Sequence, residues 1–260
     1  MLQAPQRSAL SGPALVRLLA RLAEADVAEP RQSLADRLSH WLGWTDAIAL
    51  SSALNGEPPA VAVGARAFGR AEEDECTRVR RSLVSAIASD SVLGGSRRRG
   101  AAASSAQMSA PRLAADTQAD YAVFRQRYLA LQQSMETAIG TLRGRLRALL
   151  ATQAPALARL AVVDAVMERA LGERERTLLG AVPGLLGGHF ERLKANAEAA
   201  ATTPTAAVQP KPSLAHGHVN AAASDAWLDA FRKDMQSVLL AELDVRFQPV
   251  EGLLAALRTC

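Results

Sequence analysis

Apolar residues recur at helical spacing along most of the chain, and the clearest stripe lies between residues 121 and 150. Its positions are separated by steps of three or four residues: Tyr121, Phe124, Tyr128, Leu131, Met135, Ala138 or Ile139, Leu142, Leu146 and Leu149. The opposite face carries arginines, a glutamate and both Gln132 and Gln133. This spacing predicts one long amphipathic helix with a coiled-coil-like stripe. Such a helix must pack against another helix to be stable in water.

Weaker helical patterns lie on both sides of this segment. We expect helices from Pro13, from Ser33 to Leu54 with an interruption at Gly43, and from Glu72 to Leu93. Pro155 and Pro183 separate two further helices over 157–182 and 185–200, and Ser224 is expected to cap a last helix that ends near Arg258. The apolar side of this last helix is predicted to pack back on residues 121–150.

Two segments are too poor in apolar bulk to join a core, and they divide the chain. Residues 94–117 are rich in Arg, Ala and Ser, and residues 202–223 are rich in Pro and Ala, so both are predicted to be flexible linkers. The fold class is therefore all-α. We expect a compact N-terminal helical unit (1–93), then an elongated antiparallel bundle formed by the long helices of 118–201 and a C-terminal helix (224–260).

The charge balance looks basic, with a formal net charge of +4 and a pI of about 9.6. Only Lys194, Lys211 and Lys233 are lysines, so 27 of the 30 basic residues are arginines. Most of these arginines alternate with acidic residues, which is typical of solvated helix faces. The balance therefore favours ordinary helix surfaces over a surface built for nucleic acid.

Cysteine usage and hydropathy both fit a cytoplasmic protein without a membrane span. Cys76 and Cys260 are the only cysteines, which makes neither a disulfide framework nor a zinc site. No run reaches the roughly 18 apolar residues of a transmembrane helix. The closest segment, TLLGAVPGLLGG at 177–188, is interpreted as a buried helix end and turn, although contact with a membrane surface remains an alternative.

Motifs that carry catalytic or metal chemistry are missing from the sequence. It contains no phosphate-binding loop, no nucleophile elbow, no CxxC and no HExxH. His216 and His218 could bind a metal only if a partner supplied further ligands, and His40 and His189 are interpreted as packed helix residues. We therefore expect no catalytic residue, no metal and no cofactor, and the protein is not expected to be an enzyme.

Two groups of residues are candidates for binding a partner. Trp41 and Trp44 would share one side of a helix if that helix continued through Gly43, and large aromatic residues often dominate protein interfaces. Tyr121, Phe124 and Tyr128 begin the strongest apolar stripe. A third candidate is Arg97-Arg98-Arg99, three consecutive cations in the first linker that could bind an anion.

The N-terminal stretches QAPQRSALSGPALVRLLARL and RQSLADRLSHWLGWTDAIALSSAL resemble a family of uncharacterised proteobacterial proteins that is classed only as a domain of unknown function. The resemblance covers most of the chain and is most specific at residues 11–13 and 35–47. The family has no established activity, so it implies no catalytic residue. Its gene neighbourhoods, which encode proteins similar to proton-motive stator or outer-membrane-anchoring components, imply an accessory role beside an envelope machine.

Together these patterns favour a non-enzymatic helical interaction protein, an adaptor or assembly factor. The main alternative is nucleic-acid binding through the arginine-rich segments 78–81 and 97–99. The amphipathic helices could bind a protein partner or a second copy of the chain, and the sequence leaves this choice open.

Overall fold

The computed structural model describes residues 13–25, 32–57, 68–94, 120–202 and 216–259, and the regular elements in these ranges are all helices. They are α1 (Ala14–Ala23), α2 (Leu34–Trp41), α3 (Trp44–Asn55), α4 (Arg70–Ala88), α5 (Tyr121–Gln153), α6 (Pro155–Gly180), α7 (Val182–Thr202) and α8 (His216–Arg258). The all-α prediction is therefore confirmed. None of these helices is both long enough and apolar enough to cross a membrane.

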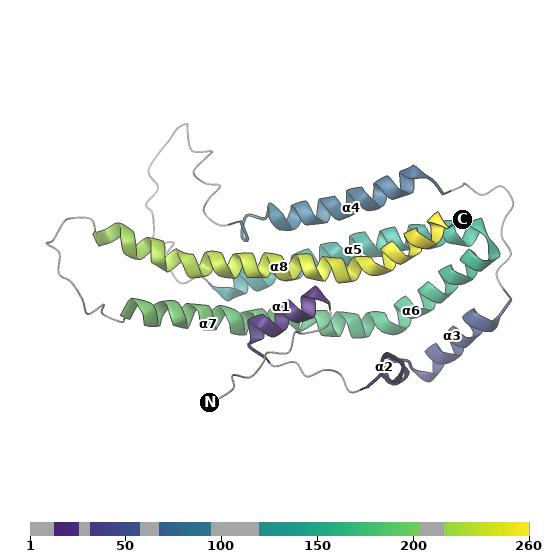
Figure 1. The fold of residues 1–260 in the computed structure, drawn as a ribbon, viewed down its shortest axis with the longest axis horizontal. Helices are drawn as coiled ribbons and strands as arrows, with labels where there is room; N and C mark the ends of the chain where they lie inside the picture. Colours follow the sequence, from purple (N-terminus) through teal and green to yellow (C-terminus); the bar gives the residue numbers. More distant parts are fainter. Residues whose placement is uncertain (1–12, 26–31, 58–67, 95–119, 203–215, 260) are drawn as a thin grey trace, which may run out of the picture.

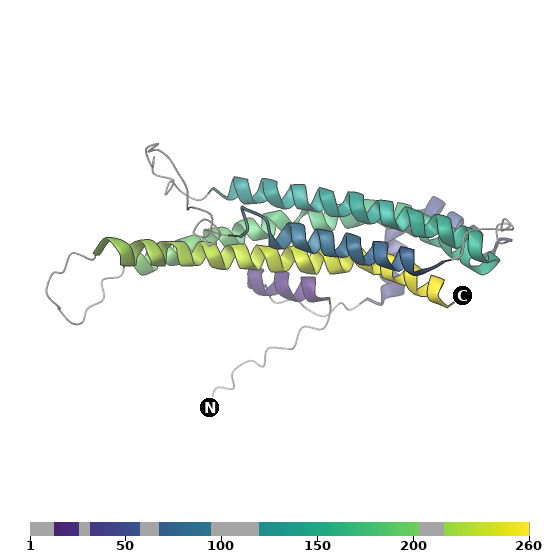
Figure 2. The same ribbon diagram turned by 90° about the horizontal axis from the view of Figure 1, so that it is seen from above.

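Four rows of helix form an elongated bundle (Figures 1 and 2). α5 and α8 lie side by side along its centre and run in the same direction. α6 and α7 run the opposite way and cover one side of this pair, while α4 covers the other side and is also antiparallel to it. The predicted packing of the last helix on residues 121–150 is confirmed, and the central pair is parallel within an otherwise antiparallel bundle.

The expected compact N-terminal unit is not found in the described residues. α1 packs on α7 and α8, α2 and α3 pack on α6, and α4 packs on α5 and α8, but these four helices do not contact one another. α1 and α4 each bury one narrow face, through Leu15 and Leu22 of α1 and through Leu83 and Ile87 of α4, whereas no residue of α3 is fully buried. Each short helix packs its apolar face on the longer helices rather than on another short helix, because the longer helices offer more surface.

Some helix ends agree with the sequence, but α4 ends at Ala88, five residues before the expected end at Leu93, and the start of α8 also differs. Ser33 accepts a hydrogen bond from the backbone N–H of Asp36 at 3.1 Å, as an N-cap should, and Pro155 begins α6. α8 begins at His216, eight residues before the expected cap at Ser224, so the second predicted linker is too long at its C-terminal end. Residues 216–223 contain three alanines and no proline, and this composition is compatible with a helix.

Segment 177–188 spans the end of α6 and the start of α7. Leu179, Val182, Pro183 and Leu186 are buried there, whereas Leu178 and Leu185 are 52% and 46% exposed, so the segment is a helix junction that is only partly buried. The aromatic end of the bundle lies beside it, where rings from α5, α7 and α8 meet: Tyr121, Phe124, Phe190, Trp227 and Phe231.

A buried polar cluster joins three of the long helices at the middle of the bundle. The Glu242 side chain on α8 is fully buried. It accepts hydrogen bonds from Tyr128 Oη at 2.7 Å, from Gln132 Nε2 at 2.9 Å and from Arg246 Nε at 2.9 Å. Gln132 Nε2 also donates to the backbone oxygen of Leu179 on α6 at 3.0 Å. The Glu242 carboxylate is therefore desolvated but satisfied, which is the condition for burying a charge.

Gln132 corrects the pattern drawn from the sequence, which placed it on the solvent face. It is buried because α5 has neighbours on several sides, namely α4, α6, α7 and α8. A helix enclosed in this way buries more than its apolar stripe, so a polar residue beside the stripe must find partners inside the protein.

We expect Glu242→Ala to lower the free energy of unfolding by about 3–5 kcal/mol, because it leaves Arg246 and the Tyr128 hydroxyl buried without their shared acceptor. Urea unfolding followed by circular dichroism measures this loss. The control is Arg145→Ala, which removes an ion pair with Glu75 from an arginine side chain that is 63% exposed and should cost less than about 1 kcal/mol. Equal losses in the two variants would contradict the role of the cluster.

Candidate functional site

The two tryptophans predicted to share a helix face lie on separate helices. α2 ends at Trp41, Leu42 and Gly43 are extended, and α3 begins at Trp44. Trp41 is half-buried, with the guanidinium carbons of Arg37 and Arg174 at 5.3 and 5.5 Å from its ring centre. Trp44 is 82% exposed. Because the helix is interrupted at Leu42 and Gly43, Trp41 faces the bundle and Trp44 faces solvent.

Trp44 and Ile48 form what we call the α3 outer face. They are one helical turn apart, and Ile48 is 50% exposed. The opposite face of α3 packs against α6 through Ala49, Leu50 and Ala53, which are partly buried. Ile48 and Leu50 are two residues apart and so point to different sides of α3, and only Leu50 is partly buried.

Polar contacts at both ends fix α3 on α6. Asp46 lies 3.8 Å from the guanidinium of Arg169, and Arg159 donates to the backbone oxygen of Gly56 at 3.0 Å. The α3 outer face is consequently presented on an anchored helix. An exposed tryptophan held on an anchored helix gives a surface that can bind another protein without a large ordering cost.

The other aromatic candidates, Tyr121, Phe124 and Tyr128, point into the bundle. Tyr128 is fully buried, and Phe124 packs edge-on against Phe231 with ring centres 5.3 Å apart. Tyr121 donates a hydrogen bond to the backbone oxygen of Pro183. Phe124 and Tyr128 therefore belong to the core of the bundle, and Tyr121 is partly buried against it.

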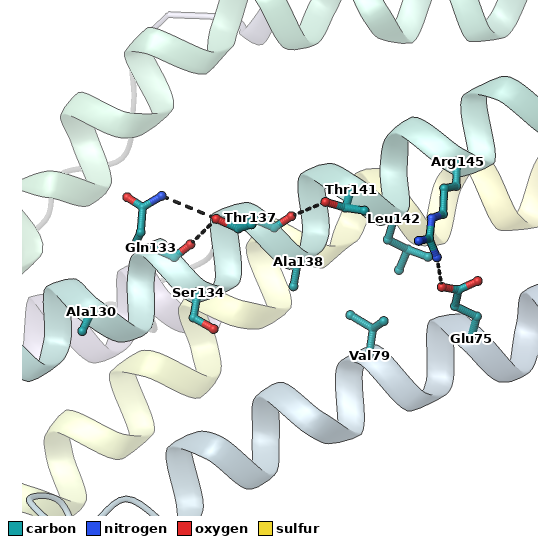
Figure 3. A pocket seen from close by; sticks show the side chains of 10 residues that line it. All are labelled: Glu75, Val79, Ala130, Gln133, Ser134, Thr137, Ala138, Thr141, Leu142 and Arg145. Carbon is teal, nitrogen blue, oxygen red and sulfur yellow. Dashed lines mark hydrogen bonds and ion pairs between the residues drawn. The ribbon is translucent and has the colours of Figure 1, made fainter.

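A groove of about 600 Å³ lies between α4 and α5 (Figure 3). Its α5 wall carries small and hydroxyl side chains: Ala130, Ser134, Thr137, Ala138 and Thr141. Thr137 and Thr141 donate to carbonyl oxygens one turn back in their own helix, at 2.9 and 2.8 Å. Glu75 and Arg145 pair across the groove, so each neutralises the other. Both threonine hydroxyls of the groove are therefore already hydrogen-bonded within α5.

The arginines proposed for nucleic-acid binding have different environments. Arg80 pairs with Glu251 and with Asp244 on α8, and Arg78 lies 3.6 Å from Glu75. Arg81 is exposed on α4. Arg97, Arg98 and Arg99 lie outside the described residues. The described part of the arginine-rich region is thus largely engaged in ion pairs with acidic residues.

The remaining titratable candidates are held in local contacts. His189 is buried, with Nε2 at 2.9 Å from a carboxylate oxygen of Asp234, and His40 Nδ1 lies 2.7 Å from the backbone oxygen of Asp36. His216 and His218 fall in the first turn of α8. Burial raises the pKa of the Cys76 thiol, which disfavours the reactive thiolate. Within the described ranges, no group of three or more His, Cys, Asp or Glu side chains is arranged to hold a metal ion.

The two tyrosines of the chain provide a test of this packing. Burial raises the pKa of both, and the nearby Glu242 charge raises that of Tyr128 further. Because the folded pKa values exceed the unfolded value of about 10, their contribution to stability is present below pH 10 and is lost as the pH rises above it.

We therefore expect absorbance at 295 nm to show little phenolate in the native protein at pH 10, and both tyrosines to ionise as the bundle unfolds at higher pH. The same protein in concentrated urea should titrate near pH 10. Gradual ionisation near pH 10 with unchanged circular dichroism would show that the tyrosines are accessible.

Comparison with known proteins places the chain in a family without assigning an activity. Neither a curated protein nor a solved structure matches it. The profile of the family described as "Protein of unknown function (DUF3348)" matches residues 1–259. Because this match covers nearly the whole chain, the protein belongs to the family of proteins of unknown function DUF3348.

Proposed function

We propose that this protein is a non-enzymatic adaptor or assembly factor that binds a protein partner through the α3 outer face. The observation that carries the proposal is the exposure of Trp44, 82% of whose surface is accessible on a helix already anchored on α6. Tryptophan is among the residues most enriched at the energetic centres of interfaces, where truncation costs about 2 kcal/mol or more.

In this proposal the other described helices form a rigid bundle that holds α3 in place. Its long helices bury their own apolar faces, and the buried polar cluster has its hydrogen bonds made within the bundle. α3, by contrast, buries none of its residues fully. Trp44 is the most exposed of the large apolar side chains in the described residues, and such a side chain is expected where a partner completes the packing.

Nucleic-acid binding is the weaker candidate. A phosphate-binding surface needs cations that are free of protein carboxylates. Arg78 and Arg80 lie beside acidic residues of α4 and α8, and this arrangement lowers the positive potential that they present.

The proposal also includes a cytoplasmic location and an accessory role beside an envelope-associated complex. The cell fraction in which the partner is captured tests both.

The test compares three forms of the full chain as affinity baits: the natural protein, Trp44→Ser and Val123→Ser. Val123 is also an exposed apolar residue, at 54%, but lies on α5. Soluble and detergent-solubilised membrane fractions of the source organism are analysed separately, with nuclease added to half of each. We expect a specific partner that survives nuclease, falls at least about tenfold with Trp44→Ser and is unchanged with Val123→Ser.

Thermal unfolding of the three baits should be the same within a few degrees, because both substituted side chains are exposed. Recovery of the partner at full level by Trp44→Ser would reject the α3 outer face as the binding surface. Loss of all captured proteins on nuclease treatment would instead favour the nucleic-acid alternative. Light scattering of the purified protein distinguishes a second copy of the chain from a different partner.

A further inference from the structure

A cavity of about 600 Å³ lies between α2, α5, α6 and α8, next to the buried polar cluster. Arg246, which binds Glu242, also forms part of the cavity wall. Apolar side chains line the interior: Ile139, Leu171, Leu178, Leu179, Val245 and Pro249. The ring of Trp41 on α2 contributes a further wall. This volume lies in the range of pockets that hold small organic molecules, about 300–1,000 Å³.

Two glycines keep the cavity open on the α5 and α6 sides. Gly140 and Gly172 both line it, and a Cβ atom added at either position would meet nothing within 4 Å. Any larger residue at these positions would extend into the cavity or its mouth. A large side chain at either position is therefore expected to occupy part of this space.

One charge at the wall of the cavity has no counter-ion. Four arginines and three glutamates line the cavity, and two of these arginines also pair with carboxylates outside it, Arg143 with Asp164 at 2.7 Å and Arg246 with Glu242 at 2.9 Å. Each glutamate has an arginine partner: Glu136 with Arg176 at 3.9 Å, Glu168 with Arg143 at 3.4 Å and Glu175 with Arg246 at 3.4 Å. Arg174 is left without a carboxylate within ion-pair distance in the described residues, and its guanidinium lies over the Trp41 ring instead.

A second arginine, Arg37, lies at the same Trp41 ring as Arg174. Arg37, one helical turn before Trp41 on α2, also places its guanidinium over the Trp41 ring, at 5.3 Å, and it too has no carboxylate partner among the described residues. Two guanidinium groups at one aromatic ring raise the local positive potential at the wall of an apolar cavity. An amphipathic anion fits such a site, because its apolar part can be buried in the cavity while its negative group pairs with a guanidinium at the wall.

We propose that this cavity binds an amphipathic anion, a small molecule with an aromatic or aliphatic body and a carboxylate or sulfonate head. The body lies among Ile139, Leu179 and Val245, and the head pairs with Arg174 beside Trp41. This site is separate from the α3 outer face, and it assigns the bundle a ligand-binding role in addition to the adaptor role.

The experiment uses two fluorescent probes with the same apolar body. One is 8-anilinonaphthalene-1-sulfonate, which carries an anionic head, and the other is the neutral N-phenyl-1-naphthylamine. We expect the folded full-length protein to bind the sulfonate with 1:1 stoichiometry, and at least about fivefold more tightly than the neutral probe. A gain of about 1 kcal/mol for one partly exposed charge pair corresponds to this ratio.

Four variants locate the binding. Arg174→Gln should weaken the sulfonate about fivefold and leave the neutral probe unchanged. Gly172→Leu should weaken both probes by a similar factor, because the leucine side chain occupies part of the space that their shared apolar body needs. Gly144→Leu is the matched control, since Gly144 also has open space beside it but does not line the cavity, and it should bind both probes normally. Trp44→Ser should also bind both, which separates this site from the α3 outer face.

Circular dichroism melts of every variant confirm that the probes report on folded protein. If Gly172→Leu is folded and retains both affinities, the probes bind elsewhere and the site is rejected. If Arg174→Gln leaves the sulfonate affinity unchanged, or weakens both probes equally, the cavity does not select an anion. Absence of binding by either probe to the natural protein would show that the cavity is not accessible.

Discussion

Burial of the Glu242 carboxylate is the constraint on which the bundle depends. A charge removed from water must receive hydrogen bonds inside the protein, and here they come from Tyr128 and Gln132 on α5 and from Arg246 on α8 itself. Because Gln132 also donates to the Leu179 carbonyl, the same few atoms fix the relative positions of α5, α6 and α8. Apolar stripes alone would tolerate sliding of one helix along another, whereas these bonds are made in one register only. The cluster thus explains why two long parallel helices keep a single alignment.

The N-terminal helices pack on the outside of the bundle that the long helices form. α1, α4 and the α2–α3 pair each cover a different part of the surface, and their positions rest on narrow apolar faces and partly exposed ion pairs such as Asp46 with Arg169. α3 buries none of its residues fully, and its outer face retains Trp44 and Ile48 in solvent. Both proposals follow from this arrangement. The partner surface lies where the N-terminal helices leave apolar residues exposed, and the cavity lies where α2 meets the long helices beside Arg246.

Charge pairing distinguishes the surfaces that can act from those that stabilise. Arg143 and Arg147 look like solvent-facing residues in the sequence, yet Arg143 lies 2.7 Å from Asp164, and Arg147 pairs with Glu168 across the α5–α6 interface. Arg80 likewise links α4 to α8. The basic composition is therefore largely used within the bundle. Arg174 and Arg37 differ because an aromatic ring, rather than a carboxylate, is their neighbour.

The sequence by itself determined the helical class, the strong 121–150 stripe, the break at Pro155 and the return of the last helix onto that stripe, because helical periodicity and proline chemistry are local. It also carried one unused signal for the cluster: Glu242 lies four residues after Val238 and three after Leu239, on the apolar side of α8. Only the tertiary structure decided that Gln132 is buried, that Phe124 and Tyr128 are core residues with Tyr121 packed beside them, and that the N-terminal helices pack separately on the long helices. It also decided which tryptophan is exposed. These outcomes depend on which helices become neighbours and how much surface each encloses, and periodicity within one helix does not specify either.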